Sequence, residues 1–255
     1  PAAQAAPRAP ADPAAARRAP AAERAPNDPS PRPSASRGLY GRKDPRYDGV
    51  WRQSLALLAQ RAAGLRPAAP AVAWLAGQQC ADGGFAAYRA DPAAPCDARK
   101  GEFTDATAAA VQALAAVGDA PGAGDADAAV RRGLAWLTGH QNPDGGWGLT
   151  SGAPTDANST SAAVGAFAAA GRDPAQVTHG AGGPGPYAAL LGLQLGCDAP
   201  ERDRGAFAYA PAPGQGRAAA NDLATTAATL AAEGSGLLVR PVAGADRPAR
   251  PLACP

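Results

Sequence analysis

The chain has 255 residues, of which 46% are hydrophobic, but alanine supplies much of that fraction and there are only four Trp, five Tyr, four Phe and no Met. Alanine-rich surfaces allow helices to approach closely, whereas a sheet would need more β-branched and aromatic residues. A net charge of +2 is too small to indicate a nucleic-acid-binding protein, and the chain lacks the run of about 18 apolar residues that a membrane-spanning helix requires.

The chain divides into a helical region between two tails. Residues 1–37 are rich in Ala, Pro and Arg, a composition that predicts a disordered tail. Residues 38–235 carry the helical patterns, and residues 236–255 form a Pro-, Arg- and Gly-rich C-terminal extension. Glycines at 64, 118 and 171 mark expected helix ends. We expect helices near residues 48–63, 68–79, 104–117, 126–141, 156–170, 185–195 and 221–233.

Part of this region is repeated. Residues 73–85 read AWLAGQQCADGGF and residues 135–147 read AWLTGHQNPDGGW, so equivalent positions are 62 residues apart. A degraded third copy ends near Phe207 and Tyr209. The recurrence predicts an array of similar helical units.

A second recurring element follows each of these copies. It reads TDAT at residues 104–107, TDANST at residues 155–160 and NDLATT at residues 221–226, and an earlier copy begins near Asp48. Side chains of this kind cap the free N–H groups at a helix start, and a carboxylate suits the positive end of the helix dipole. The chain therefore alternates two types of helix.

Four cysteines are present, and three connectivities can be drawn between them. We favour Cys80–Cys96 and Cys197–Cys254, and four buried free thiols are the alternative. Closing the first loop would stabilise the fold by roughly 3 kcal/mol in the chain-entropy model. Disulfides and a start at Pro1 without Met predict a processed, secreted or cell-surface (extracytoplasmic) protein.

The second copy matches a known pattern. Arg132-Gly133, Leu137, Gln141, Gly145 and Trp147 satisfy the QW repeat, and the first copy keeps Gln79, Gly83 and Phe85 but has Pro70-Ala71 in place of the basic residue and Gly. Over roughly residues 40–235 the chain resembles the prenyltransferase/squalene oxidase repeat proteins of the terpenoid cyclase/protein prenyltransferase superfamily.

The resemblance implies an all-α fold of the α/α-toroid type, in which inner helices ring a cavity and outer helices pack around them. It implies a structural role for the QW residues Gln79, Gly83, Phe85, Gln141, Gly145 and Trp147. Seven helices are fewer than the twelve of a complete family toroid. We therefore expect an open barrel, or one completed by a partner chain.

The family contains enzymes and non-enzymes. Cyclases protonate an alkene with an Asp-rich motif inside an aromatic-lined cavity, but each helix start here carries a single Asp. The aromatic residues Trp74, Phe85, Tyr88, Trp136, Trp147, Phe207 and Tyr209 belong to the outer repeat, leaving Trp51, Phe103, Phe167 and Tyr47 or Tyr187 for a cavity. No zinc-binding set is visible, so we predict neither metal nor cofactor.

These observations favour a non-catalytic binding module, with an isoprenoid cyclase as the alternative that a second carboxylate beside Asp105 or Asp156 would support. By similarity to the α-domain of the vertebrate cobalamin carriers, a polar ring at one mouth would bind a small molecule, corrinoid-like or isoprenoid. The competing interpretation is that these residues are only helix caps. The ring would consist of Asp105, Thr107, Asp156, Asn158, Thr160, Asn221, Asp222 and Thr225.

Overall fold

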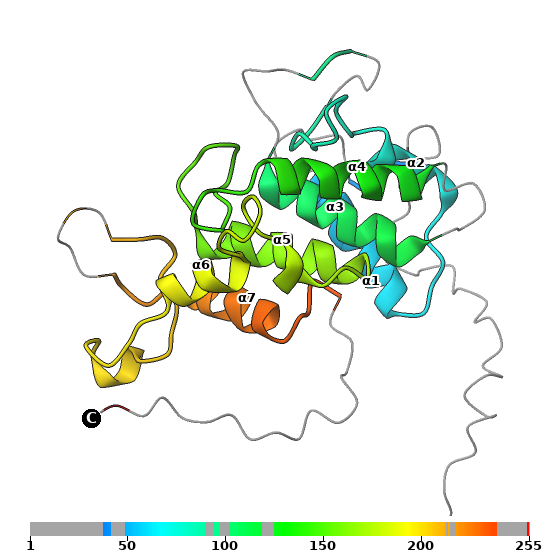
Figure 1. The fold of residues 1–255 in the computed structure, drawn as a ribbon. Helices are drawn as coiled ribbons and strands as arrows, with labels where there is room; N and C mark the ends of the chain where they lie inside the picture. The colour runs from blue at the N-terminus through cyan, green and yellow to red at the C-terminus, as the bar shows by residue number, and fades with distance from the viewer. Residues whose placement is uncertain are drawn as a thin grey trace, which may run out of the picture. The chain divides into compact units, whose positions relative to one another are not determined.

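The computed structural model describes residues 38–41, 49–89, 94–96, 103–118, 125–212, 214, 218–238 and 254. Over these residues the protein is all-α, with isolated bridges but no strand (Figure 1). The predicted N-terminal tail, Tyr47 and nearly all of the C-terminal extension lie outside the described residues. The helices are α1 (Val50–Ala62), α2 (Ala69–Ala76), α3 (Thr104–Val117), α4 (Ala126–Gly139), α5 (Ala157–Ala169), α6 (Pro186–Leu193) and α7 (Asp222–Ala232).

All seven helices lie where the sequence predicts them. Gly64, Gly118 and Gly171 follow α1, α3 and α5 with positive φ angles of 71°, 58° and 70°, a backbone conformation that glycine adopts without a Cβ clash. Proline occupies the first turn of α2 and of α6, where its missing N–H breaks no helical hydrogen bond. None of the described helices has the length and apolar character needed to cross a membrane.

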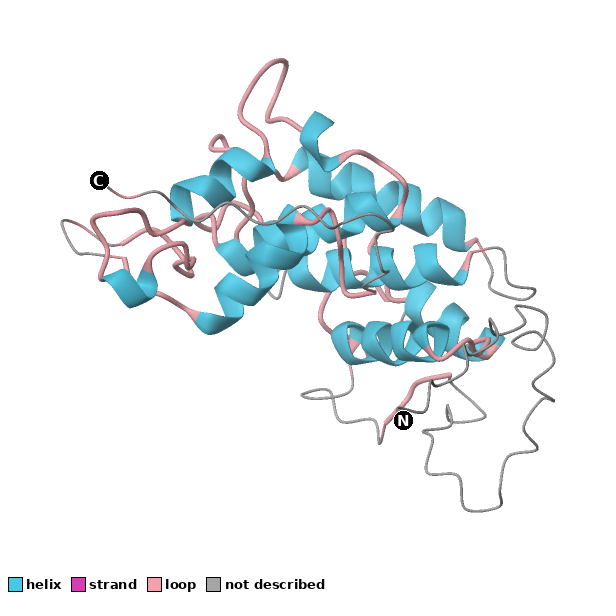
Figure 2. Cartoon of the chain, turned by 90° about the horizontal axis from the view of Figure 1, so that it is seen from below, coloured by secondary structure: helices cyan, strands magenta, loops and turns pink. Residues whose placement is uncertain are grey.

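The helices form a main row and a set of covering helices. In the main row, α1, α3, α5 and α7 pack side by side in that order. The covering helices are α2, which packs on α1, α3 and α4; α4, which packs on α3 and α5; and α6, which packs on α5 (Figures 1 and 2). Trp147, Phe85, Leu57 and Leu75 are fully buried in the resulting core.

The fourth residue of each main-row helix holds an aromatic residue of the preceding loop. In α3, α5 and α7 the fourth residue is a threonine whose Oγ1 accepts a hydrogen bond from the backbone N–H of the aromatic residue. The pairs are Thr107 with Phe85 (2.9 Å), Thr160 with Trp147 (3.0 Å) and Thr225 with Phe207 (2.9 Å). In α1 the fourth residue is Gln53, and its Oε1 accepts from the N–H of Tyr40 at 2.9 Å. The same contact therefore recurs four times.

Tyr40 marks a copy of the repeat that the sequence analysis missed. The glycine of each repeat turn has no room for a side chain. A Cβ atom on Gly38 would lie 1.8 Å from the carbonyl oxygen of Pro70, one on Gly83 would lie 2.5 Å from that of Arg132, and one on Gly145 would lie 2.5 Å from that of Gly185. All three glycines have positive φ. Each repeat turn thus presses its glycine against the backbone of the next covering helix, at the start of α2 and α6 and in the middle of α4, and only glycine fits there.

The repeats are also joined sideways. The first backbone N–H of α1, α3 and α5 donates to a carbonyl oxygen of the following repeat, two residues after its aromatic residue. The three bonds are Val50 N to Ala87 O (2.8 Å), Thr104 N to Leu149 O (2.9 Å) and Ala157 N to Tyr209 O (2.8 Å). These bonds satisfy donors that a helix start leaves free. They also align the starts of the four main-row helices along one edge of the fold, which we call the rim.

The glutamines of the QW motif bind backbone carbonyls. Gln79 Nε2 donates to Gly83 (2.9 Å) and to Ala129 of α4 (2.8 Å), while Arg132 donates to Gln79 Oε1. Gln141 Nε2 likewise donates to Gly145 at 2.8 Å. The next repeat has Gly185 in place of the arginine, and the buried Gln141 Oε1 lacks a partner.

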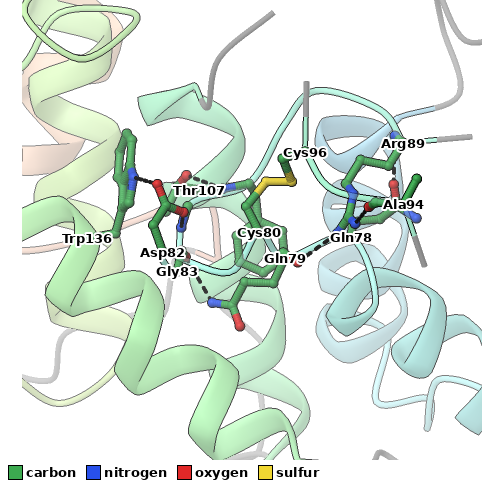
Figure 3. Close-up of a disulfide and its surroundings, with 12 residues drawn as sticks. Gln78, Gln79, Cys80, Asp82, Gly83, Arg89, Ala94, Cys96, Thr107 and Trp136 are labelled. Atoms are coloured by element: carbon green, nitrogen blue, oxygen red, sulfur yellow. Dashed lines mark hydrogen bonds between the residues drawn. A yellow bond between two sulfur atoms is a disulfide. The ribbon is translucent and has the colours of Figure 1, made fainter. Parts of the chain in front are cut away.

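The cysteines form two disulfides, and both predicted pairs are confirmed. Cys80 bonds to Cys96, with 5.7 Å between the Cα atoms, and Cys197 bonds to Cys254 across 5.4 Å. Figure 3 shows the first bond beside the turn that carries Gln79 and Asp82, where Asp82 accepts from the indole N–H of Trp136 at 3.2 Å. The disulfide thus secures the loop between a QW turn and α3.

Candidate functional site

The candidate site lies on the side of the main row that faces away from the covering helices. The fourth residue of a main-row helix points to the covering side, since Thr107 contacts the loop after α2 and Gly133 of α4. At 3.6 residues per turn, the second, sixth, ninth and thirteenth residues point the opposite way. We call this side the inner face. In α3 it carries Asp105, Ala109, Gln112 and Ala116, and in α5 it carries Asn158, Ala162, Gly165 and Ala169.

The rim end of the inner face combines two polar and two apolar side chains. The second residues of α1, α3, α5 and α7 are Trp51, Asp105, Asn158 and Leu223. Trp51 is 42% exposed and Leu223 is 74% exposed. Asp105 and Asn158, between them in the row, are partly buried. The rim therefore places two hydrogen-bonding groups between two accessible apolar groups.

Asp105 and Asn158 each present an oxygen without a hydrogen-bond partner. The Oδ1 atoms of both residues are buried, and neither receives a hydrogen bond. Buried polar atoms in folded proteins are nearly always paired, and an unpaired one costs free energy. Because the two residues hold the same position in neighbouring helices, their free acceptors form a matched pair at the rim.

Asp156 adds a second carboxylate beside Asp105. It is 3% exposed and caps α5, accepting from Ser159 N at 2.8 Å and from Ser159 Oγ at 2.9 Å. Burial raises the pKa of Asp105, a hydrogen bond from Ser159 opposes this, and the charge of Asp156 raises it further. Burial also raises the pKa of Asp156, against hydrogen bonds from Ser159 and Asn158. Both carboxyls therefore favour the protonated form more than a free aspartate does.

Tyr209 is the site residue that the sequence analysis missed, because it was assigned to the outer repeat. Its pKa is raised by burial and then by the charges of Asp156 and Asp105, and the residue is 44% exposed. A cavity of about 380 Å³ opens beside Tyr209, between residues 208–212 and 218–221. The backbone of Tyr209 also receives the first N–H of α5.

The structure gives the predicted ring residues three different roles. The hydroxyls of Thr107, Thr160 and Thr225 are used in the repeat contacts. Asp156 and Asn221 are N-caps, as the competing interpretation expects. Asp105 and Asn158 cap no helix: Phe103 precedes α3 without a side-chain cap, and Asp156 caps α5.

The three aspartates of the predicted ring hold different positions in their helices. Asp105 is the second residue of α3, Asp156 is the cap of α5, and Asp222 is the first residue of α7 and is exposed. The three are therefore not equivalent, although Asp105 and Asp156 do lie close enough for their charges to interact. Within the described ranges, no three His, Cys, Asp or Glu residues gather as a metal site would require.

The aromatic residues reserved for a cavity are mostly placed elsewhere. Phe167 is 3% exposed and lies 6.3 Å from the ring of Trp147, on the covering side of α5. Phe103 precedes α3, and Tyr187 belongs to α6. Of the aromatic residues that were left for a cavity, Trp51 is the one at the second position of a main-row helix.

No protein-family model matches the chain, and no curated protein matches it. The resemblance to the QW repeat proteins stays a prediction that rests on the two repeats ending at Phe85 and Trp147.

Proposed function

We propose that this protein is an exported, non-catalytic binding module of the squalene-cyclase-like repeat type, and that its ligand sits at the rim of the inner face. The observation that carries the proposal is the matched pair of free acceptors, Asp105 Oδ1 and Asn158 Oδ1, between Trp51 and Leu223. The two disulfides agree with export, because such bonds persist in oxidising compartments.

The site chemistry indicates a ligand with N–H or O–H donors beside an apolar body. Two adjacent acceptors would receive amide or hydroxyl groups, and Trp51 and Leu223 offer apolar contact on either side. The cavity beside Tyr209 is also lined by Asn221, the residue that caps α7. An amide-rich, corrinoid-like molecule fits this pattern better than a bare isoprenoid hydrocarbon, which would leave both acceptors unpaired.

Native mass spectrometry of the protein isolated from its own host tests the proposal. We expect a co-purified small molecule that is retained by the wild type and lost from a double variant, Asp105→Ala with Asn158→Ala. Asp222→Ala is the matched control, because Asp222 belongs to the predicted ring but is exposed at the first position of α7. Loss of the ligand from the control as well, or retention by the double variant, would refute the site.

A cyclase is the second candidate, and Asp156 beside Asp105 is the observation that favours it. Two carboxyls with raised pKa values could keep one proton between them, as an acid catalyst needs. However, Asp156 is already bonded twice by Ser159, and the inner faces of α3 and α5 carry alanine and glycine rather than aromatic rings. Cyclised product after incubation with squalene or geranylgeranyl diphosphate would establish this function instead.

A further inference from the structure

A short segment after α7 lies across the inner face at the end opposite the rim. This segment, Ser235–Leu238, is called the strap. It begins where α7 turns out of its helix at Gly234, whose φ is +63°, and Ser235 N donates back to Leu230 at 2.9 Å. The strap then meets α3 and α5 two helical turns beyond the second residues of those helices. Leu238 packs against the core.

The strap is held through its main chain. Leu237 N–H donates to Gln112 Oε1 at 2.6 Å, although the two residues are 125 positions apart. Gln112 is 2% exposed, and its Nε2 donates to Ala162 of α5 at 3.3 Å, which holds the amide oriented toward the strap. Gln112 thus serves as a fixed acceptor for a backbone N–H, a group that every residue except proline supplies.

Glycine is needed on both sides of this contact. A Cβ atom on Gly236 would lie 2.2 Å from Gln112 Oε1 and 3.1 Å from the Cα of Gly165. A Cβ atom on Gly165 would lie 2.8 Å from the Cα of Gly236. The surface therefore selects a segment with glycine at one position and a main-chain N–H at the next.

The strap leaves part of this surface open. A cavity of about 220 Å³ remains between it and the ends of the helices, lined by Ala116, Ala168 and Ala169 together with Gln112, residues 233–236 and Leu238. The tail beyond the strap is tied back to the fold by Cys197–Cys254. Because the strap is tethered at both ends, its effective concentration at this surface is high.

We propose that the inner face around Gln112 and Gly165 is a docking surface for a glycine-containing polypeptide segment, which it recognises through the main chain, and that the strap is its resident occupant. A partner would present a Gly-Leu-like pair in an unstructured segment and would compete with the strap. This surface is distinct from the carboxyl pair at the rim, so the proposal does not depend on the small-molecule function.

Freeing the surface in the full-length protein tests the proposal. Leu237→Pro removes the N–H that bonds to Gln112, whereas Leu237→Ala keeps it and changes only a side chain that is 37% exposed. The probe is a fluorescein-labelled peptide of residues 233–238, followed by fluorescence anisotropy. We expect the Leu237→Pro variant to bind the peptide and the wild type and Leu237→Ala to bind it at least tenfold more weakly, since the strap excludes it.

Specificity is tested with a second peptide and a second variant. A peptide with valine at the position of Gly236 should no longer bind to the Leu237→Pro variant. Adding Gln112→Leu to that variant should weaken its binding of the original peptide about tenfold, which is the effect of one hydrogen bond. If Leu237→Pro disturbs folding, Gly236→Val displaces the strap by contact alone. Equal binding of the peptide by all proteins, or no binding by either folded strap variant, would overturn the proposal.

Discussion

Replacing Thr160 by valine tests the contact on which the repeat is built. Thr160 is fully buried, and its Oγ1 accepts from Trp147 N at 3.0 Å. Valine has nearly the same shape, so the variant creates no cavity and removes only the hydroxyl, which also donates to the Trp147 carbonyl at 3.3 Å. The Trp147 N–H is then buried without a partner, which costs about 1–3 kcal/mol. A loss of about 2 kcal/mol lowers the melting temperature of a domain of this size by about 4–8 °C.

Thermal and urea unfolding, followed by circular dichroism, measure this loss. Thr138→Val is the matched control, because Thr138 is an exposed residue whose hydroxyl donates within its own helix to Leu134 at 3.0 Å. We expect the control to change stability by less than about 0.5 kcal/mol. Thr225→Val should fall between the two, since Thr225 is only half-buried and water can replace its hydroxyl. Equal melting of wild type and Thr160→Val would show that the contact does not support the repeat.

Three further predictions concern the core, the rim and the tail. Trp147→Ala removes a fully buried ring and its 2.8 Å hydrogen bond to Leu137, so urea unfolding should show a loss of about 3–5 kcal/mol, and an unchanged midpoint would contradict the burial. Burial and the charge of Asp156 raise the pKa of Asp105, so its ionisation opposes folding and the free energy of unfolding should fall as pH rises above about 4. In urea titrations at pH 4–7, Asp105→Asn should make this fall smaller. A pH profile identical to that of the wild type would contradict the prediction. Cys254→Ser opens a loop of 57 residues and should cost about 2–4 kcal/mol in non-reducing melts. Reductant should destabilise the wild type by more than this, because it also opens Cys80–Cys96.

Local patterns predicted the helices and the disulfides well, because their signals lie within a few neighbouring residues. Capping residues, glycine stops and first-turn prolines mark the helix ends directly. The same signals did not show the register of the aspartates. A carboxylate is favoured both at the cap and in the first helical turn, so Asp105 and Asp156 read alike in sequence although they differ by two positions in their helices.

The missed features depend on contacts between distant segments. The threonine that marks each repeat follows its aromatic residue by 22 positions at Thr107 and by 13 at Thr160, and this variation in loop length hides the spacing. The first copy ends in Tyr40 and pairs with a glutamine instead of a threonine. The predicted boundary after residue 235 also needs correction, because Gly236 and Leu238 pack on the helical core.

The surface of α7 explains why the row of helices ends there. The first, fifth, eighth and twelfth residues of a main-row helix face the next repeat, and in α1, α3 and α5 the first three of them are buried, as with Ala157, Ser161 and Val164. In α7 these positions are Asp222, Thr226, Thr229 and Glu233, and all four are exposed. The threonine hydroxyls donate to carbonyls of their own helix, at 2.8 and 2.7 Å, and so need no partner across an interface. A polar, self-satisfied face is typical of the terminal unit of a repeat array. Among the described residues the row therefore ends on a polar face, and a ring-completing partner would have to bury two carboxylates there, a cost that no cation on α7 offsets.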